Sequence, residues 1–503
     1  MTELKYLGYD KRPTISIPNS AGQCVVGWDA IADQLRRKIA DCSEIPVVVA
    51  VECYPGVHVK DVVEGLGARL QGIEIIQAEE AMHSSEVVEV MASPYTGGDD
   101  PTFGYLAPLT LPDWFDPDAV AKVRRRIASP SAPITLVVGC GATYLTDADI
   151  VVYASLSRWE AQNRFRRNET GNLGIGNATV AASEQYKHAY FVDWRIGDRW
   201  KQSVLPSCDF VIDANDPRRY KMAAGDVVRR AYRHTVERPF RVVPFFDPAP
   251  WGGQWMKDVC DLDRDVVNFG WCFDCVPEEN SVLFDLGGVD FELPANDLTL
   301  FHPQELLGAQ VFEKFGAEFP IRFDFLDTMD GGNLSFQVHP LTEYIQQNFG
   351  MHYTQDESYY ILDAGEDACV YLGLREGVDP AAMKRDLRKA QTGRAAFPAD
   401  DYACKWPARK HDHFLIPAGT CHCSGRNAMV LEISATPYIF TFKMWDWDRL
   451  GLDGKPRPIH LEHALANLQW DRDESWVREQ LINQFQPLAE TDDWREERTG
   501  LHD

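Results

Sequence analysis

The period of the hydrophobic pattern changes once along this 503-residue chain, and that change constrains the fold more than any other feature. From about Ile45 to Tyr232, Val/Ile-rich runs alternate with amphipathic stretches of helical period. The apolar runs are IPVVVAVE, PITLVVG, DIVVYASL and CDFVIDA, and the helical stretches are VKDVVEGLGARL, SRWEAQNRFRR and DPRRYKMAAGDVVRRAY. Strands without polar alternation are typical of a parallel sheet that is covered by helices on both faces. This part of the chain is therefore predicted to be an α/β domain.

A second pattern follows a proline-rich linker, RPFRVVPFFDPAP, within residues 237–250. Helices are predicted to be sparse beyond it, and short strands with Gly, Pro and Asp turns dominate, as in WCFDCVP, SVLFDLG, IRFDFLD, LSFQVH, SYYILDA, CVYLGL, HFLIPAG, AMVLEIS and YIFTFKM. Such strands indicate a β-sandwich or barrel, and we expect a jelly-roll barrel. The predicted organisation is an N-terminal segment (1–40), the α/β domain (41–240), the all-β domain (241–470) and a charged helical tail (471–503).

The charge balance limits the partners that the chain can have. Fifty Lys and Arg residues against 76 Asp and Glu residues give a net charge of −26, which argues against a nucleic-acid or anionic-membrane surface. An anionic substrate would therefore need a local cationic pocket. The start, MTELKYLGYDKRP, lacks the apolar core of a signal peptide, and the twelve cysteines are too dilute for a disulfide scaffold. We predict a cytoplasmic protein.

Four polar residues of the all-β half make a candidate metal site. Gln337 and His339 stand two apart in LSFQVHP, so they share one face of the predicted strand. Glu357 begins the strand in QDESYYILD, and His422 ends the pattern P-x-G-x-x-H in FLIPAGTCHC. Two imidazoles, a carboxylate and an amide oxygen suit Zn²⁺ or a similar divalent ion with one position left open. The alternative is that these are hydrogen-bonded core residues without a metal.

The P-x-G-x-x-H pattern resembles the second metal motif of cupins, and the wider sequence resembles the short bacterial form of type I mannose-6-phosphate isomerases. Over about residues 244–470 the matching segments are PWGGQWMKDVCDLD, FPIRFDFLDTMDGGNLSFQVHP, ESYYILDAGEDACVYLGLREGVD, FLIPAGTCHC and TFKMWDWDRLGLDGKPRPIHLEHAL. The resemblance implies a cupin barrel with zinc held by Gln337, His339, Glu357 and His422. It also implies that mannose 6-phosphate and fructose 6-phosphate are interconverted through an enediol, with the metal stabilising the oxyanion.

The same resemblance suggests catalytic and substrate-binding residues. Glu432 in VLEIS matches an acid of the active-site wall and is the candidate for proton transfer. Lys443 falls where relatives have an arginine, so it is a second catalytic candidate that would hold the phosphate or polarise a substrate oxygen. Trp251, Ser335 and Gln355 are the candidate substrate-binding residues. The alternatives are an exposed strand lysine for Lys443 and ordinary packing for Trp251.

Two departures from the family concern charge. Asp324 and Gln355 stand where relatives usually carry lysines that favour an anion, and the change from Lys to Asp reverses the local charge. A non-catalytic, metal-containing sugar-binding cupin, or an isomerase of another sugar phosphate, therefore remains as an alternative function. The basic residues that could compensate are Arg322, Lys405, Arg409, Lys410, Arg426 and Arg449.

Residues 41–235 resemble the uridine-kinase-like branch of P-loop kinases through VVVAVECYPGV, DPTFGYLAPLTLPDWFDPDAV and SRWEAQNRFRRNETG. When Lys60 is placed on the phosphate-binding lysine, Tyr54 and Val59 replace the two glycines, and Asp61 replaces the hydroxyl that binds Mg²⁺. We therefore expect a degenerate kinase-like domain that serves as a scaffold.

Four arginines follow the strand DIVVYASL, and two interpretations of them stay open. They either line an anion site or form a solvated basic helix face. These residues are Arg158, Arg164, Arg166 and Arg167.

Overall fold

The computed structural model describes residues 8–43, 45–436 and 438–499, and the chain divides into two compact units. The α/β unit consists of Arg12–Val243 and Pro277–Glu318, and the sandwich unit consists of Met1–Lys11, Pro244–Val276 and Phe319–Asp503. The predicted boundary at residue 240 lies beside Val243, but the segment Pro277–Glu318 belongs to the α/β unit instead of the domain that follows it. The outer ends of the two predicted terminal segments, residues 1–7 and 500–503, lie outside the described residues.

A seven-stranded sheet forms the core of the α/β unit, in the order β2-β8-β7-β6-β3-β5-β4. The five strands from β7 to β4 are parallel, and β8 and β2 extend the sheet antiparallel. The predicted α/β sheet is thus confirmed. Its strands are β2 (Cys24–Val26), β3 (Val47–Cys53), β4 (Ile73–Gln77), β5 (Ile134–Gly139), β6 (Ile150–Ser155), β7 (Phe210–Asp213) and β8 (Lys221–Ala224).

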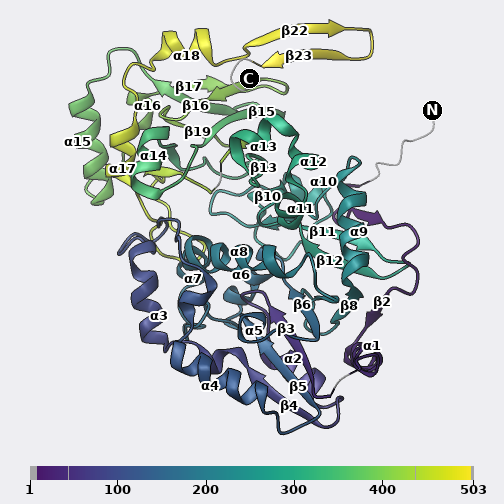
Figure 1. Ribbon diagram of the computed structural model, residues 1–503. Helices are drawn as coiled ribbons and strands as arrows, with labels where there is room; N and C mark the ends of the chain where they lie inside the picture. The colour runs from purple at the N-terminus through teal and green to yellow at the C-terminus, as the bar shows by residue number, and fades with distance from the viewer. Residues whose placement is uncertain (1–7, 44, 437, 500–503) are drawn as a thin grey trace. The chain divides into compact units, whose positions relative to one another are not determined.

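Helices cover this sheet as the amphipathic pattern requires. Helix α2 packs on β4 and β5, and α9 packs on β7 and β8 (Figure 1). Part of the predicted last helix, DPRRYKMAAGDVVRRAY, is instead the strand β8, because Lys221 pairs with Asp213 of β7 in the sheet and by a 2.7 Å ion pair. The helices are α1 (Trp28–Ala40), α2 (Val59–Gly67), α3 (Ser85–Ala92), α4 (Pro117–Ala128), α5 (Ala142–Leu145), α6 (Arg158–Arg166), α7 (Ala182–His188), α8 (Trp194–Val204) and α9 (Gly225–Val236).

The returning segment Pro277–Glu318 completes the α/β unit. Its strands β11 (Ser281–Asp285) and β12 (Asp290–Pro294) form a three-stranded sheet with β1 (Thr14–Ser16), and helices α11 (Asn296–Phe301), α12 (Pro303–Leu307) and α13 (Ala309–Phe315) follow. Asp297 of α11 is fully buried, forms a 2.7 Å ion pair with Lys201 and accepts a hydrogen bond from Tyr232. Buried charges are retained only when they are paired, so these contacts fix the segment in this unit.

Two antiparallel sheets form the sandwich unit, in the orders β18-β15-β20-β13-β10-β9 and β17-β16-β19-β14-β21. The first sheet comprises β9 (Phe245–Asp247), β10 (Trp271–Cys275), β13 (Ile321–Asp327), β15 (Asp356–Ala364), β18 (His413–Ile416) and β20 (Ala428–Ala435). The second comprises β14 (Phe336–Val338), β16 (Cys369–Leu374), β17 (Ala403–Pro407), β19 (His422–Ser424) and β21 (Phe442–Trp445).

The predicted strands are therefore present. However, the described residues form two open sheets in this unit and not the closed jelly-roll barrel that we expected. The edge strand β18 shows why. Its outer side meets the chain near Leu481, whose carbonyl accepts the amide hydrogen of Leu415 at 2.9 Å, instead of a strand of the other sheet. Hydrophobic alternation predicts which face of a strand is buried, but it does not predict which edges pair.

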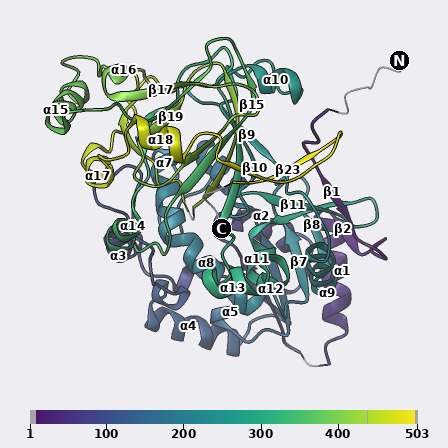
Figure 2. The same ribbon diagram turned by 90° about the horizontal axis from the view of Figure 1, so that it is seen from above.

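Helices are more frequent in this unit than predicted. Helix α16 contacts the edge strand β17, and the two lie side by side in Figure 2. The helices are α10 (Trp255–Val259), α14 (Thr342–Phe349), α15 (Pro380–Gln391), α16 (Ala399–Tyr402), α17 (Leu461–Asn467) and α18 (Glu474–Gln480).

Among the described residues of the predicted helical tail, α18 is the only helix. A hairpin of β22 (Phe485–Glu490) and β23 (Arg495–Thr499) follows, because the Thr491 amide bonds the Trp494 carbonyl at 2.8 Å and closes a turn. The hairpin is the yellow ribbon at the top of Figure 1. Across both units, no helix among the described residues has the length and apolar character that a membrane span needs.

Candidate metal centre and active site

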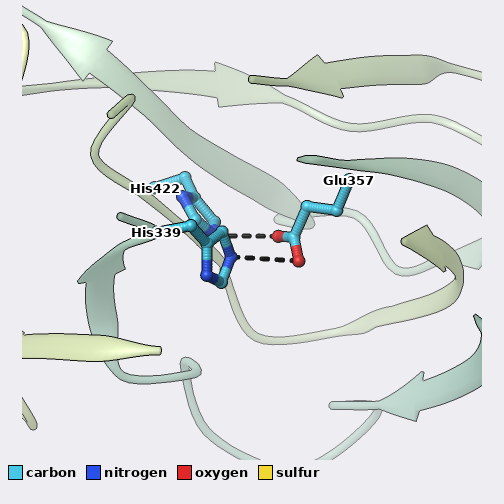
Figure 3. A group of neighbouring side chains, drawn as sticks. All are labelled: His339, Glu357 and His422. Carbon is cyan, nitrogen blue, oxygen red and sulfur yellow. Dashed lines mark ion pairs between the residues drawn. The ribbon is translucent and has the colours of Figure 1, made fainter. Parts of the chain in front are cut away.

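Three side chains from the two sheets of the sandwich unit converge at one point (Figure 3). His339 directly follows β14, His422 begins β19, and Glu357 lies near the start of β15. His339 Nε2 is 3.1 Å from one oxygen of Glu357, and His422 Nε2 is 2.8 Å from the other. All three residues have 0% exposure, and their ligand atoms lie within 4.8 Å of one another. We call these three residues the His/Glu cluster.

Backbone carbonyls fix the orientation of both imidazoles. His339 Nδ1 lies 2.8 Å from the Phe440 carbonyl oxygen, and His422 Nδ1 lies 2.9 Å from that of Thr420. A carbonyl only accepts, so each Nδ1 carries a hydrogen and donates it. In a neutral ring Nε2 then carries a lone pair, and both lone pairs face the Glu357 carboxylate. A buried carboxylate between two lone pairs requires a cation, and this set of donors fits a divalent metal ion.

The pKa values of Glu357 and His339 reflect their contact with each other. Burial raises the pKa of Glu357, but the two imidazoles outweigh burial and hold the pKa well below its ordinary value. Burial opposes protonation of His339, yet the Glu357 carboxylate raises the pKa of His339 above its usual range. A proton on His339 thus occupies the role that a metal ion would take, so protons and metal would compete for the cluster.

Gln337 lies next to the cluster on the second sheet. Its amide nitrogen is 3.3 Å from His422 Nε2, and its cross-strand partners are His422 on β19 and Lys443 on β21. Directly paired residues project from the same face of a sheet. The row of His422, Gln337 and Lys443 therefore presents an imidazole, an amide and an amine to one side.

Gln355, directly before β15 of the first sheet, contacts the cluster. Its amide nitrogen donates to Glu357 at 3.0 Å, and its amide oxygen accepts from the Phe440 backbone at 3.1 Å. The carbonyl of Phe440 in turn orients His339. The side chain was predicted to bind substrate, but here it is buried and both of its polar atoms contact protein groups.

Two acids lie beside the cluster on the first sheet. Asp324 of β13 is the direct cross-strand partner of Glu432 of β20, and both are buried. Burial, together with the nearby Glu357, raises the pKa of Asp324 to about 8, with Arg322 acting in the opposite direction. Burial, Asp324 and Glu357 also raise the pKa of Glu432 well above its ordinary value. Glu432 thus holds a proton more readily than an ordinary glutamate.

Cationic groups gather around Lys443. The lysine is half-buried, and burial followed by the charge of Arg457 lowers its pKa to about 7. Arg457 and Arg449 both pair with Asp446, at 2.9 and 2.6 Å. Ser335 donates to Asp446 at 2.8 Å and accepts from Arg457 at 3.1 Å, so its hydroxyl is part of this network. Two guanidinium groups share one carboxylate, which leaves net positive charge beside Lys443.

The remaining site predictions have different surroundings. Trp251 is buried, packs edge-to-face on Trp271 with ring centroids 4.8 Å apart, and its carbonyl accepts from the Gly332 amide. Among the proposed compensating cations, Arg449 lies near Lys443 and Arg322 near Asp324, whereas Arg426 pairs with Asp367.

Sequence reasoning missed the carbonyl groups of Phe440 and Thr420. Every residue has a carbonyl, so no signal in the sequence singles these two out. It also missed Asp446, although the spacing of Asp446 and Arg449, three residues apart, was available in the sequence.

Of the four arginines, Arg158 and Arg164 follow neither of the two open interpretations, whereas Arg166 and Arg167 are exposed, as a solvated helix face predicts. Arg164 is fully buried and donates to the carbonyls of Gly56 and Ala214 at 2.8 and 2.6 Å, and Arg158 is buried in an ion pair with Asp198. These two side chains hold the fold together instead of facing solvent or an anion. Arg166 lies over the Trp159 ring, and Arg167 pairs with Glu160 and Glu169.

Comparisons with known proteins give two kinds of match. Residues 27–237 match a family described as "Domain of unknown function (DUF8485)", and the comparisons give no support to the kinase-like resemblance. Over 217 residues the chain is 29% identical to the mannose-6-phosphate isomerase of Streptococcus mutans, which covers 43% of this chain and 63% of that protein. Bacillus subtilis ManA, also named a mannose-6-phosphate isomerase, is 29% identical over 231 residues, or 46% of this chain and 68% of that protein.

Among solved structures, the mannose 6-phosphate isomerase of Bacillus subtilis aligns with a TM-score of 0.39 and 21% identity, over 46% of this chain and 68% of that one. A putative mannosephosphate isomerase of Archaeoglobus fulgidus aligns with a TM-score of 0.37 and 18% identity, over 51% of this chain and 75% of that one. The chain thus spans somewhat less than two thirds of the Streptococcus mutans relative.

Proposed function

We propose that the protein is a metal-dependent aldose–ketose isomerase that interconverts mannose 6-phosphate and fructose 6-phosphate. The observation that carries this proposal is the buried His/Glu cluster, which lies within about residues 244–470, where the sequence motifs resemble type I mannose-6-phosphate isomerases. The 29% identity to two proteins named mannose-6-phosphate isomerases supports it. Open sites with two histidines and one carboxylate are typical of catalytic zinc.

His339, Glu357 and His422 would hold the divalent ion, which we propose to be Zn²⁺, with Gln337 as the fourth protein donor. When bound, such an ion supplies positive charge that stabilises the oxyanion of an enediol intermediate. The carbonyls of Phe440 and Thr420 keep the Nε2 atoms of both imidazoles directed at the site.

Proton transfer is assigned to Glu432. Isomerisation removes a proton from the carbon next to the carbonyl and returns it to the adjacent carbon. Because its pKa is raised, the Glu432 carboxyl would retain the proton between these two events.

Lys443 is the candidate for binding the substrate anion. The two arginines that share Asp446 add positive charge beside it, which would offset part of the effect of Asp324 at a position where relatives carry a lysine. Opposite charge in a partly desolvated pocket favours a phosphate group.

The test combines metal analysis with a coupled isomerase assay on the full chain. His422→Ala and Glu357→Ala should each lose bound metal and all turnover. His413→Ala removes another buried histidine of the sandwich unit, outside the cluster, and should keep metal stoichiometry and turnover. Metal-loaded wild-type protein without turnover, even at high enzyme concentration, would refute the isomerase proposal.

A second candidate function is a non-catalytic, metal-containing sugar-binding protein. Asp324 and Gln355 favour it, because both replace lysines that would attract an anion. It predicts bound metal and sugar-induced thermal stabilisation without turnover, and turnover that appears in the double variant Asp324→Lys/Gln355→Lys. A panel of 6-phosphate sugars in the same assay would reveal an isomerase of another sugar phosphate.

A further inference from the structure

The turn of residues 417–420 contacts both histidines of the His/Glu cluster. Its Thr420 amide donates to the carbonyl of the first turn residue at 3.1 Å, and its Thr420 carbonyl accepts from His422 Nδ1 at 2.9 Å. In the middle of the turn, the Gly419 amide donates to the His339 carbonyl at 2.9 Å. The position of this turn therefore affects the ring of His422 and the backbone of His339.

The same turn also contacts the strand that carries the third member of the cluster. The Ala418 amide donates to the Asp356 carboxylate at 2.7 Å. Asp356 is the first residue of β15 and directly precedes Glu357. All three residues of the cluster are thus joined to one turn, each by a hydrogen bond on the residue itself or on its neighbour.

A segment that begins at the end of α17, residues 467–472, contacts this turn from its other side. The Gln469 amide donates to the Gly419 carbonyl at 2.9 Å. A Cβ atom on Gly419 would lie 2.8 Å from Gln469 Cγ, so the segment and the turn are in close contact there. Asn467 Oδ1 accepts from the Leu341 amide at 2.8 Å, in the loop that follows β14. The segment therefore contacts both loops that carry a histidine of the cluster.

The side chain of Arg472 makes the polar contacts between this segment and the turn. Its Nη1 donates to the carbonyls of Pro417 and Ala418, at 3.0 and 2.7 Å, and to the Thr420 hydroxyl. Nη1 carries two hydrogens, so one of them is shared between two acceptors. The guanidinium carbon lies 5.2 Å from the centre of the Trp476 ring, and the backbone carbonyl of the arginine accepts from the end of β16 at 2.9 Å. Both ends of the arginine are therefore held in place.

We propose that Arg472 is a positioning residue of the metal centre, which holds the turn so that the ring of His422 faces the ion. This inference rests on the proposed function, because it takes the His/Glu cluster as the site of a divalent ion. Ligands that are already oriented lose less freedom when they bind a metal, so the groups that orient them raise its affinity. Arg472 lies in the predicted charged tail, outside the residues 244–470 whose motifs resemble the isomerases.

The test is competition between the full chain and a chromogenic chelator for Zn²⁺, together with the visible spectrum of the Co²⁺-loaded protein. Arg472→Met keeps an apolar stem and removes the donors, so it should weaken Zn²⁺ binding about tenfold. It should also change the Co²⁺ spectrum, which depends on the geometry of the ligands. Arg472→Lys keeps the charge and a donor group, and it should restore the affinity to within about threefold of wild type.

The matched control is Arg478→Met. Arg478 lies on α18, over the Trp406 ring and paired with Glu474, so it has a similar setting in the same tail without contact to the turn. This variant should keep the Zn²⁺ affinity within about twofold. Circular dichroism at the assay temperature shows which variants are folded. If Arg472→Met does not fold, Thr420→Val is the second variant.

Thr420→Val removes only the hydroxyl that accepts from Arg472 and leaves the carbonyl that orients His422. It should weaken Zn²⁺ binding about threefold, as loss of one contact behind a ligand does. Its effect should be smaller when Arg472 is already replaced by lysine, because residues that act through one contact are not additive.

Equal Zn²⁺ affinity and an unchanged Co²⁺ spectrum in wild type and Arg472→Met would overturn this inference alone and leave the metal centre in place. With Arg472→Met unfolded, wild-type affinity in Thr420→Val would do the same. A loss in Arg478→Met as large as that in Arg472→Met would also overturn it, because the effect would then follow from the stability of the tail. Wild-type protein that binds no divalent ion would overturn the proposed function as well.

Discussion

The side chain of Gln355 connects one candidate metal ligand with the backbone that orients another, through Glu357 and Phe440. We expect Gln355→Ala to weaken metal binding about 10- to 100-fold, as loss of a group that positions a ligand does. Competition with a chromogenic chelator measures the change. Gln347→Ala, on the exposed face of α14, is the control and should have no effect. Unchanged metal affinity with a raised KM would instead assign Gln355 to substrate binding.

Lys443 titrates near neutral pH, and this gives the substrate site a distinct pH dependence. With a pKa of about 7 it is charged below pH 7 and loses its charge as the pH rises through that value. If Lys443 binds the phosphate, KM should rise about tenfold between pH 6 and 8, following the charged fraction. Lys443→Arg keeps its charge and should remove this rise. Titration of the substrate phosphate affects both enzymes equally, so the difference between the two pH profiles reports the lysine. Parallel profiles would contradict the assignment.

At the residue scale, strand periodicity placed Gln337 and His339 on one face, and the structure brings His339, Glu357 and His422 together. Sequence spacing could not show that Gln355 bonds Glu357, because the same glutamine could equally have faced a substrate. Nor could it show that Ser335 and Arg457 meet at Asp446, since Ser335 and Asp446 are 111 residues apart and only the pairing of β14 with β21 joins them.

The pairing of β13 with β20 places Asp324 opposite Glu432, and we expect the free energy of unfolding to depend on pH as a result. The folded-state pKa of Asp324 is about 8, against an ordinary value of 3.8, so the folded protein keeps a proton that the unfolded chain releases. Stability is therefore lost as the pH rises from about 4 to about 8. Asp324→Asn mimics the protonated acid. Its gain over wild type should be small at pH 4 and grow by up to about 1.4 kcal/mol per pH unit towards pH 8.

Urea denaturation of chelator-treated protein measures this gain, because a bound metal would itself lower carboxyl pKa values. The control is Asp330→Asn, an exposed aspartate just after β13, which should give no pH-dependent difference. A constant difference between Asp324→Asn and wild type at all pH values would show that Asp324 is ionised in the folded state.

At the element scale, local patterns identified β3, β5, β6 and β7 because continuous Val/Ile runs leave little ambiguity. The strand β8 was mistaken for part of a helix because KMAA has good helix propensity. Its pairing with β7 is a tertiary contact, and such contacts override propensity. The hairpin β22–β23 was missed for a related reason: its charged residues fit an exposed strand as well as a helix.

Over the whole molecule, the sequence showed the change of pattern near residue 240 but not the return of Pro277–Glu318 to the α/β unit. The strand SVLFDLG has the same local pattern as its neighbours WCFDCVP and IRFDFLD. It pairs with β1, more than 250 residues earlier in the chain, and no local signal specifies that pairing.

The buried ion pair between Lys201 and Asp297 joins the returning segment Pro277–Glu318 to the rest of the α/β unit, so its contribution to stability can be measured. Both side chains are almost completely buried, so removing one leaves the other charged and without its partner ion. Asp297→Ala should destabilise the protein by about 3–5 kcal/mol, and Lys201→Met/Asp297→Leu should recover most of that loss because it removes both charges. Urea denaturation measures each variant, and metal content should stay unchanged because the His/Glu cluster lies in the sandwich unit. A cost below about 1 kcal/mol for Asp297→Ala, the level of an exposed ion pair, would show that the segment Pro277–Glu318 is not held by this pair.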